Sequence, residues 1–360
     1  MFEKVIGQER VKKIFENINR NGRYAHAYIF YGKEGTGKDA MAIELAKLIN
    51  NESDDVNIFH SQYFNFITAL PAGKDSDEEQ DPLLGLDKKD FDLYRSEIEK
   101  KSDDPYYKIS IPKANNIRIG SIRHIKKSIY LTGSKSKKKI YLISDADKMS
   151  LQSANSLLKI LEEPPKNSLL LLTTSKLNSL LPTIIGRCQS IKFNDLSSDE
   201  IKSYISQTFE GISKEEVAIY ANLSEGSISK CNSILDSNTL ELRDKVVDLL
   251  ASLLGGKYIA FGDDVNFITG LKDKEATRRF LAIMMLWFKD LSYGRSDLHQ
   301  TIVNLDKLDR INRFNENFNF DYYPIITLIE DAAREIEMNV NQELILYNLG
   351  YKIKEHISKV

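Results

Sequence analysis

The sequence has very little cysteine. Its two cysteines, Cys188 and Cys231, lie far apart in a chain of 360 residues. Two such residues supply neither a disulfide framework nor a cysteine-rich zinc site. The sequence also lacks any stretch of about 18 uncharged apolar residues, and its first residues, MFEKVIGQER, contain no apolar signal core. We therefore expect a cytoplasmic protein that makes no use of a membrane.

A large charge of one sign is also missing. The formal net charge is -2, with 42% hydrophobic and 28% charged residues, which is ordinary for a globular protein. So small a net charge does not commit the protein to nucleic acid or to acidic membranes, and any basic surface must be local. The length allows two or three domains with a large buried core.

Strand and helix patterns alternate over about the first 190 residues, which predicts a doubly wound parallel sheet. The expected strands are 27–32, 140–144, 168–175 and 189–193, and the expected helices lie near 11–18, 40–50, 119–131 and 154–161. From Leu196 onward only helical patterns follow, and capping-box sequences start at Ser197 and Ser213. We predict an α/β domain over 1–194, a three-helix domain over 195–238 and a helical domain over 239–360.

Residues 51–115 interrupt this alternation and form a predicted insertion. Within it, 63–70 and 106–112 have strand-like patterns, 88–101 is typical of a helix, and the acidic stretch 73–81 is expected at the surface.

The stretch FYGKEGTGKDA, residues 30–40, has the pattern of a phosphate-binding loop. It has the spacing G-x-x-x-x-G-K and lies between a predicted strand and a predicted helix, as that motif requires. Backbone N–H groups of such a loop surround phosphates, and the lysine reaches the outer ones. The candidate residues are Gly32, Gly35, Thr36, Gly37 and Lys38.

Two positions depart from a working ATPase. Asp39 stands where a Ser or Thr hydroxyl normally holds magnesium, and its charge would repel a polyphosphate. In the strand ending IYLISDAD, Asp145 is interpreted as the residue that organises magnesium, or else as a charge at the start of the next helix. Ala146 then replaces the glutamate that activates water. Weak or magnesium-independent binding of ATP or ADP stays open, and no cofactor is required.

Longer stretches carry a family resemblance. HAYIFYGKEGTGK, SDADKMSLQSANSLLKILEEPP, LLLLTTSKLNSLLPTIIGRCQSIKF and NVNQELILYNL resemble the delta-prime subunits of bacterial DNA polymerase III clamp loaders, which belong to the AAA+ superfamily. The resemblance covers the chain to about residue 238 and continues more weakly beyond it. It implies an AAA+ module, a small helical lid domain and an all-α C-terminal collar domain within a five-membered ring.

The resemblance also implies site residues. The family's Ser-Arg-Cys motif maps to Gly186-Arg187-Cys188, which makes Arg187 the expected arginine finger that acts in trans on a neighbour's ATP. Thr173 or Thr174 occupies the sensor position at the end of a strand, and we favour Thr174. Ser229 replaces an arginine that senses nucleotide in the family's ATPases. Asp39, Ala146 and Ser229 together are typical of a member that does not hydrolyse ATP.

The insertion departs from the family, which usually has a four-cysteine zinc module there. Residues 51–115 contain no cysteine, and His60 alone cannot hold zinc, so we expect no metal. The lysine run Lys135–Lys139 could contact a DNA backbone, although a solvated turn is the favoured interpretation.

The leading hypothesis is a non-hydrolysing clamp-loader subunit of the DNA polymerase III holoenzyme. Its expected partners are the gamma/tau and delta subunits, with primer-template DNA reached through the assembled ring. The main alternative is an active, DNA-stimulated AAA+ ATPase of the gamma/tau kind, and a further one is an AAA+ adaptor outside replication.

Overall fold

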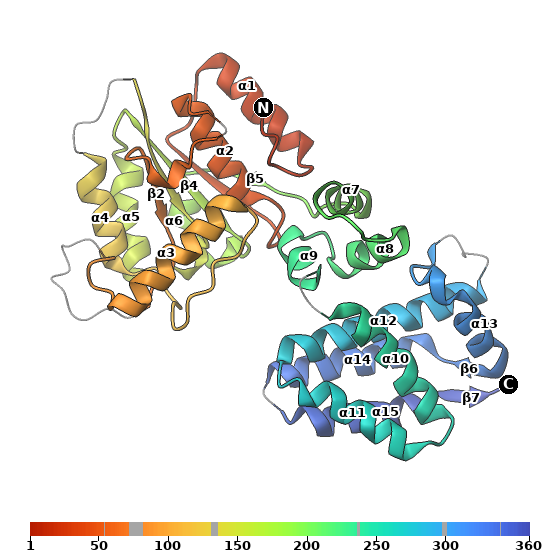
Figure 1. Cartoon of the computed structure of the whole chain (residues 1–360). Helices are drawn as coiled ribbons and strands as arrows, with labels where there is room; N and C mark the ends of the chain where they lie inside the picture. The colour runs from red at the N-terminus through yellow and green to blue at the C-terminus, as the bar shows by residue number, and fades with distance from the viewer. Residues whose placement is uncertain (54, 72–81, 131–135, 236–237, 297–300, 339) are drawn as a thin grey trace. The chain divides into compact units, whose positions relative to one another are not determined.

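The computed structural model describes residues 1–53, 55–71, 82–130, 136–235, 238–296, 301–338 and 340–360. The chain divides into two compact units (Figure 1). The N-terminal unit comprises Met1–Ile201 and Gly226–Lys230, and the C-terminal unit comprises Lys202–Glu225 and Cys231–Val360. The predicted acidic surface stretch 73–81 lies outside the described residues, and the division at 194 and 238 remains a prediction.

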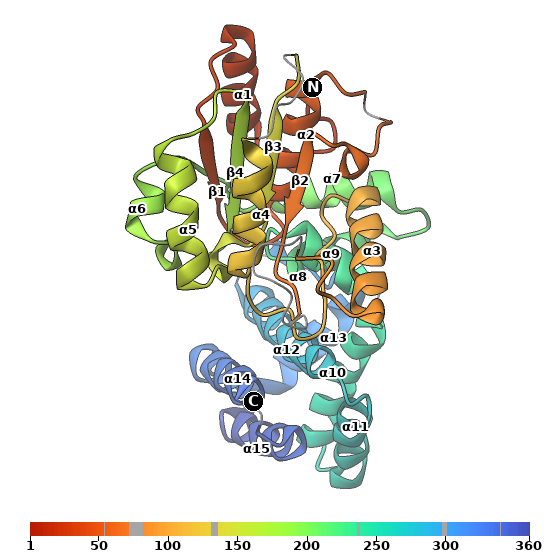
Figure 2. The same cartoon turned by 90° about the vertical axis from the view of Figure 1, so that its left-hand side faces the viewer.

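The N-terminal unit is built on a parallel sheet. Within the described residues five strands pair in the order β2-β3-β4-β1-β5, and the strands labelled β1, β4, β3 and β2 lie side by side in Figure 2. Their bounds are β1 Ala27–Tyr31, β2 Phe64–Ile67, β3 Lys139–Ile143, β4 Ser168–Thr174 and β5 Gln189–Lys192. The expected doubly wound parallel sheet is therefore confirmed.

Helices cover both faces of this sheet because its central strands are apolar on both sides. Ile29 and Leu172 face α4 (Ile119–Ile129), α5 (Leu151–Glu162) and α6 (Pro182–Ile185). Tyr28 and Phe30 alternate to the other face, where they meet Phe15 of α1 (Glu9–Asn21) in edge-to-face contacts. Helix α2 (Lys38–Asn50) begins at the phosphate-binding loop.

The insertion contributes the short helix η1 (Ile58–His60), β2 and α3 (Lys88–Asp103). The predicted strand at 106–112 is wrong, because these residues are irregular. Side chains take the backbone groups that a strand would pair: Lys101 Nζ donates to Tyr107 O, and Ser110 N donates to Glu97. The segment lies against the phosphate-binding loop instead of the sheet.

Helices dominate the rest of the chain, as predicted. Helices α7 (Ser198–Thr208) and α9 (Ile228–Leu235) each contribute residues to both units. The C-terminal unit contains α8 (Lys214–Leu223), α10 (Thr239–Leu254), α11 (Tyr258–Gly270), α12 (Lys274–Arg295), α13 (Leu308–Asn317), α14 (Tyr322–Glu337) and α15 (Gln342–Glu355). Both capping boxes form, with Ser213 and Glu216 bonded reciprocally. None of the helices in the described ranges is long and apolar enough to span a bilayer.

A single detail of the C-terminal unit differs from the all-α expectation. Strands β6 (Phe318–Phe320) and β7 (Ile357–Lys359) pair antiparallel and join the end of α13 to the last residues of the chain. The core of this unit includes Trp287 and Phe288 of α12, which are both buried.

Candidate functional site

The phosphate-binding loop has its expected context, between the end of β1 and the start of α2. Gly35 and Gly37 have φ values of 73° and 94°, which favour glycine. Thr36 is fully buried and its hydroxyl donates to Lys33 O, so it stabilises the loop from within. The loop therefore has the backbone conformation that its glycines predict.

Lys38 is turned back onto the loop itself. Its Nζ donates to Gly32 O at 2.8 Å and to Lys33 O at 2.6 Å. Burial lowers the pKa of Lys38, although nearby carboxylates, Asp39 first among them, oppose that shift. The ammonium that would contact phosphates is thus bonded to backbone carbonyls.

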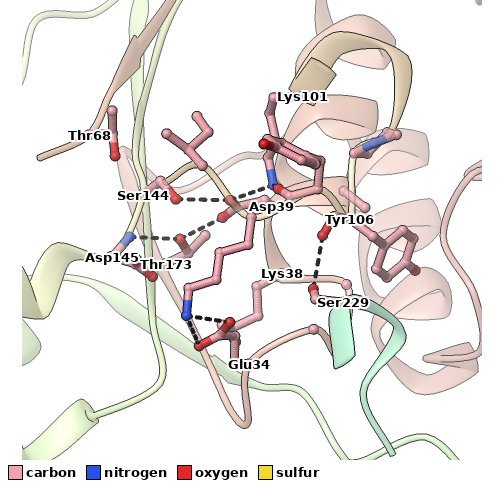
Figure 3. Close-up of a pocket in the computed structure, with 17 residues that line it drawn as sticks. Glu34, Lys38, Asp39, Thr68, Lys101, Tyr106, Ser144, Asp145, Thr173 and Ser229 are labelled. Atoms are coloured by element: carbon pink, nitrogen blue, oxygen red, sulfur yellow. Dashed lines mark hydrogen bonds and ion pairs between the residues drawn. The ribbon is translucent and has the colours of Figure 1, made fainter. Parts of the chain in front are cut away.

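Asp39 is the centre of a polar cluster (Figure 3). Lys101 Nζ lies 3.1 Å from Asp39 Oδ2, Ser144 Oγ donates to Oδ2 at 2.8 Å, and Thr173 Oγ1 donates to Oδ1 at 2.7 Å. Burial alone would raise the pKa of Asp39, but the Lys101 ammonium and the two hydroxyl donors outweigh it and lower the pKa. The carboxylate is therefore charged and satisfied within the chain.

The end of β3 differs from our interpretation. Ser144, and not Asp145, is the residue whose side chain reaches Asp39. Side chains alternate along a strand, and Ile143 faces the apolar core, so Ser144 faces α2. Asp145 lies in the pocket wall, but its carboxylate pairs with Lys148 at 2.8 Å. Ser144 is therefore the residue at the end of β3 that contacts Asp39, whereas the sequence interpretation assigned the magnesium-organising role to Asp145.

The two threonines at the end of β4 also contact different residues, because their side chains alternate along the strand. Thr173 points to Asp39 and lines the pocket. Thr174, the one we favoured, donates instead to Asp147 at 2.6 Å. The preference for Thr174 is thus corrected by the alternation of side chains, and Thr173 is the threonine in the site.

The start of α9 and the insertion close over the loop. Ile228 N donates to Gly35 O at 3.0 Å, and a Cβ on Gly35 would lie 2.1 Å from Ser227 Oγ. Ser229 Oγ donates to Tyr106 O at 2.9 Å. Ser229, which replaces the expected arginine, therefore binds the insertion.

The remaining cavity is small, about 60 Å³. Pockets that bind small molecules usually enclose about 300–1,000 Å³. The wall consists of the loop, Ser144, Thr173, Ser229 and residues of the insertion, among them Lys101, Tyr106 and Lys108. The insertion residues were missed by sequence reasoning, because no motif surrounds them and Lys101 belongs to a strongly polar helix.

Arg187 lies just beyond α6 and is not among the residues that line this pocket. Its guanidinium donates to Glu162 Oε1 at 2.9 Å and to Thr183 O at 3.0 Å. The side chains of Arg187 and Glu162 are 38% and 49% exposed, so the guanidinium is accessible from solvent.

The basic run has internal partners where it is described; Lys135 lies outside the described residues. Lys137 pairs with Glu52, Lys138 lies over the ring of Tyr24, and Lys139 donates to Ser128 O. Across the described parts of the chain, no group of three or more His, Cys, Asp or Glu residues could hold a metal ion.

Comparisons with known proteins show similarity to subunits of DNA polymerase III. The sequence model of the family described as "DNA polymerase III, delta subunit" matches residues 7–64 and 90–197. The DNA polymerase III subunit delta' of Bacillus subtilis (strain 168) is 25% identical over 354 residues, which are 97% of this chain and 96% of that protein. The chain is thus similar to a delta' subunit of DNA polymerase III over nearly its whole length.

Gamma subunits and a protein related to them are also similar to this chain. The DNA polymerase III subunit gamma of Buchnera aphidicola subsp. Schizaphis graminum is 30% identical over 239 residues, 65% of this chain and 57% of that protein. A solved gamma subunit-related protein from Thermotoga maritima is 16% identical, with a TM-score of 0.46, and the likeness covers 95% of this chain and 98% of that one. The strand order and the loop of this chain are those of an α/β module with a phosphate-binding loop, and helices make up most of the described residues after it.

Proposed function

We propose that this chain is a non-hydrolysing clamp-loader subunit that supports loading of a sliding clamp onto DNA. In this proposal it assembles in the cytoplasm with gamma/tau and delta subunits and reaches primer-template DNA through the assembled ring. It supplies Arg187 to the ATP bound by a neighbouring subunit, where the guanidinium neutralises charge that develops on the transferred phosphate. Its own nucleotide site carries out no chemistry.

The observation that carries the proposal is the saturation of Lys38 and Asp39 by groups of this chain. Lys38 Nζ is held by two carbonyls, and the Asp39 carboxylate by an ammonium and two hydroxyls. A phosphate and its magnesium would have to displace these partners, and the Asp39 charge would repel the phosphate. The residue that follows the loop lysine is thus a structural carboxylate.

Arg187 has the properties that a trans-acting residue needs. It is half-exposed, it does not line the pocket of its own chain, and a single exposed carboxylate, Glu162, holds its guanidinium. An exposed ion pair contributes about 0–1 kcal/mol, so Arg187 can exchange Glu162 for a phosphate at little cost. The peptide carbonyl of Thr183 keeps the side chain directed along α6.

The test uses a loader reconstituted from this chain with its gamma/tau and delta partners. Arg187→Ala and Arg187→Lys should both leave assembly intact and lower the DNA-stimulated ATPase rate, because lysine cannot reproduce the planar fork. Glu162→Gln is the matched control, since it removes only the resting partner and should retain the rate. An unchanged rate with Arg187→Ala contradicts the finger assignment.

The alternative is an active gamma/tau-like ATPase, which is favoured by the similarity to gamma subunits over 239 residues. The intact loop glycines and Lys38 agree with it. ATP turnover by the isolated chain distinguishes the two proposals, because an active ATPase hydrolyses ATP without a partner and loses activity with Lys38→Ala.

A further inference from the structure

The insertion lies on the phosphate-binding loop, where a nucleotide would enter. We propose that residues 97–109 are a built-in occupant of the nucleotide pocket, with the Lys101 ammonium in the place of a divalent cation. This inference deepens the proposed function and rests on it in one respect, that the pocket is not used for turnover. It gives the insertion a role. Residues 97–109 occupy the pocket and, together with the substituted residues, keep nucleotide out.

The cation position is the first element of the occupant. Lys101 is on α3, yet its side chain is only 5% exposed, and its Nζ lies between Asp39 Oδ2 at 3.1 Å and Tyr107 O at 2.8 Å. In phosphate-binding loops the residue after the lysine contacts magnesium. Asp39 is that residue, so Lys101 brings its positive charge to the side-chain position that contacts magnesium in other phosphate-binding loops.

Tyr106 is the second element. Its hydroxyl accepts from Ile6 N at 2.7 Å, and its carbonyl accepts from Ser229 Oγ. A Cβ built on Gly37 would lie 2.9 Å from the same hydroxyl, so the ring packs directly on the last glycine of the loop. Tyr106 is 6% exposed. The N-terminal segment and the loop thus meet at this ring, and the start of α9 bonds to the backbone of the same residue. In the proposal the ring fills the space beside the phosphate position.

Glu97 fixes the turn that carries these residues. It is 3% exposed and accepts from Tyr107 Oη at 2.9 Å, from Ser110 N at 2.8 Å and from Lys100 Nζ at 2.9 Å. These bonds draw the chain after α3 back along the helix. Lys108, at the edge, adds an exposed ion pair to Glu34 of the loop at 2.7 Å.

The test asks whether removal of the occupant restores nucleotide binding. The background is Asp39→Thr, which supplies the hydroxyl that a magnesium site needs. Adding Lys101→Ala and Tyr106→Ala removes the ammonium and the ring. Binding of a fluorescent ATP analogue with magnesium is measured by titration, and hydrogen exchange of β1 and β3 peptides reports that each variant is folded. Asp39→Thr with Lys88→Ala is the matched control, because Lys88 is an exposed lysine of α3 that lies outside residues 97–109 and does not line the pocket.

We expect the triple variant to bind the analogue at least about tenfold more tightly than Asp39→Thr alone, with no gain in the control. A folded triple variant that binds no more tightly than Asp39→Thr overturns the inference, as does wild-type protein that binds as tightly as the triple variant. If the triple variant does not fold, Asp39→Thr with Lys101→Met is judged by the same criterion. ATP turnover by the wild-type chain contradicts the proposed function, whereas failure to gain binding in an inert chain contradicts only the occupant.

Discussion

Lys101 Nζ lies 3.1 Å from Asp39 Oδ2, and this ion pair joins α3 of the insertion to the first turn of α2. Each of the two charges accounts for the presence of the other. An aspartate after the loop lysine is unfavourable beside a polyphosphate, and a lysine that is almost fully buried requires a charged partner. Together they make a stable contact at a position that serves catalysis in an ATPase.

Breaking this pair should destabilise the N-terminal unit strongly. Asp39→Ala leaves the Lys101 ammonium buried without its carboxylate, which costs about 3–5 kcal/mol of unfolding free energy. Asp39→Ala with Lys101→Met should recover much of that loss. Urea unfolding followed by hydrogen exchange of sheet peptides measures it, because Trp287, the one tryptophan, reports on the other unit.

The control for that experiment is the second ion pair between the same two segments. Glu34 and Lys108 are about half exposed, so Glu34→Gln should cost at most about 1 kcal/mol. Equal losses for Asp39→Ala and Glu34→Gln would show that the buried pair has no special role.

The Asp39 pair should also shape the acid sensitivity of the fold. Because the folded pKa of Asp39 is lowered, its contribution to stability is present above the usual value of about 3.9 and is lost as the pH falls through the folded pKa. The difference in unfolding free energy between wild type and Asp39→Asn should therefore be constant near neutral pH and shrink below about pH 4. A difference that stays constant into the acid range contradicts this assignment.

Gly37→Ala should destabilise the loop by about 1–3 kcal/mol, because the residue has a φ of 94° and an added Cβ would lie 2.9 Å from the Tyr106 hydroxyl. Gly120→Ala is the matched control. Gly120 is in α4, where an added Cβ meets nothing within 4 Å, so alanine should be neutral or slightly stabilising. Thermal unfolding of both variants measures the contrast, and similar midpoints would argue against close packing of Tyr106 on the loop.

Glu97→Ala should release the turn that follows α3. The change leaves Ser110 N and the Tyr107 hydroxyl without their acceptor, and a hydrogen bond to a charged group contributes about 1.5–3 kcal/mol. Hydrogen exchange of peptides spanning 104–110 should accelerate by at least about tenfold relative to wild type, while β1 and β3 exchange as before. Unchanged exchange at 104–110 would mean that other contacts hold the turn.

Local pattern predicted most of the fold. The strands of the sheet, the loop, helix α3 and the capping box at Ser213 follow from periodicity and from short-range spacing. The strand proposed at 106–112 failed because its backbone partners are side chains of α3, which no periodicity reveals. Thr174 failed for a related reason, since one residue of register decides which face of the sheet a side chain joins. Asp145 lines the pocket as predicted, but its carboxylate lies at the start of the next short helix and pairs with Lys148.

The sequence predicted which residues form the loop of the candidate site, but not which residues pack against that loop. The sequence predicts the loop and identifies Asp39 and Ser229 as departures. It does not indicate that Lys101 and Tyr106, which are more than 60 residues after Asp39 in the sequence, lie between Asp39 and Ser229. Lys101 contacts Asp39, and Tyr106 contacts Ser229. Such contacts depend on how the insertion packs, and a lysine in a polar helix looks like any exposed lysine.

The most direct test of the account is the rate of ATP hydrolysis by the isolated chain, measured with magnesium and primed DNA and compared with Lys38→Ala. The account predicts that wild type and Lys38→Ala are equal and indistinguishable from the protein-free background. Turnover of about one per second by the wild-type chain, abolished by Lys38→Ala, would contradict it.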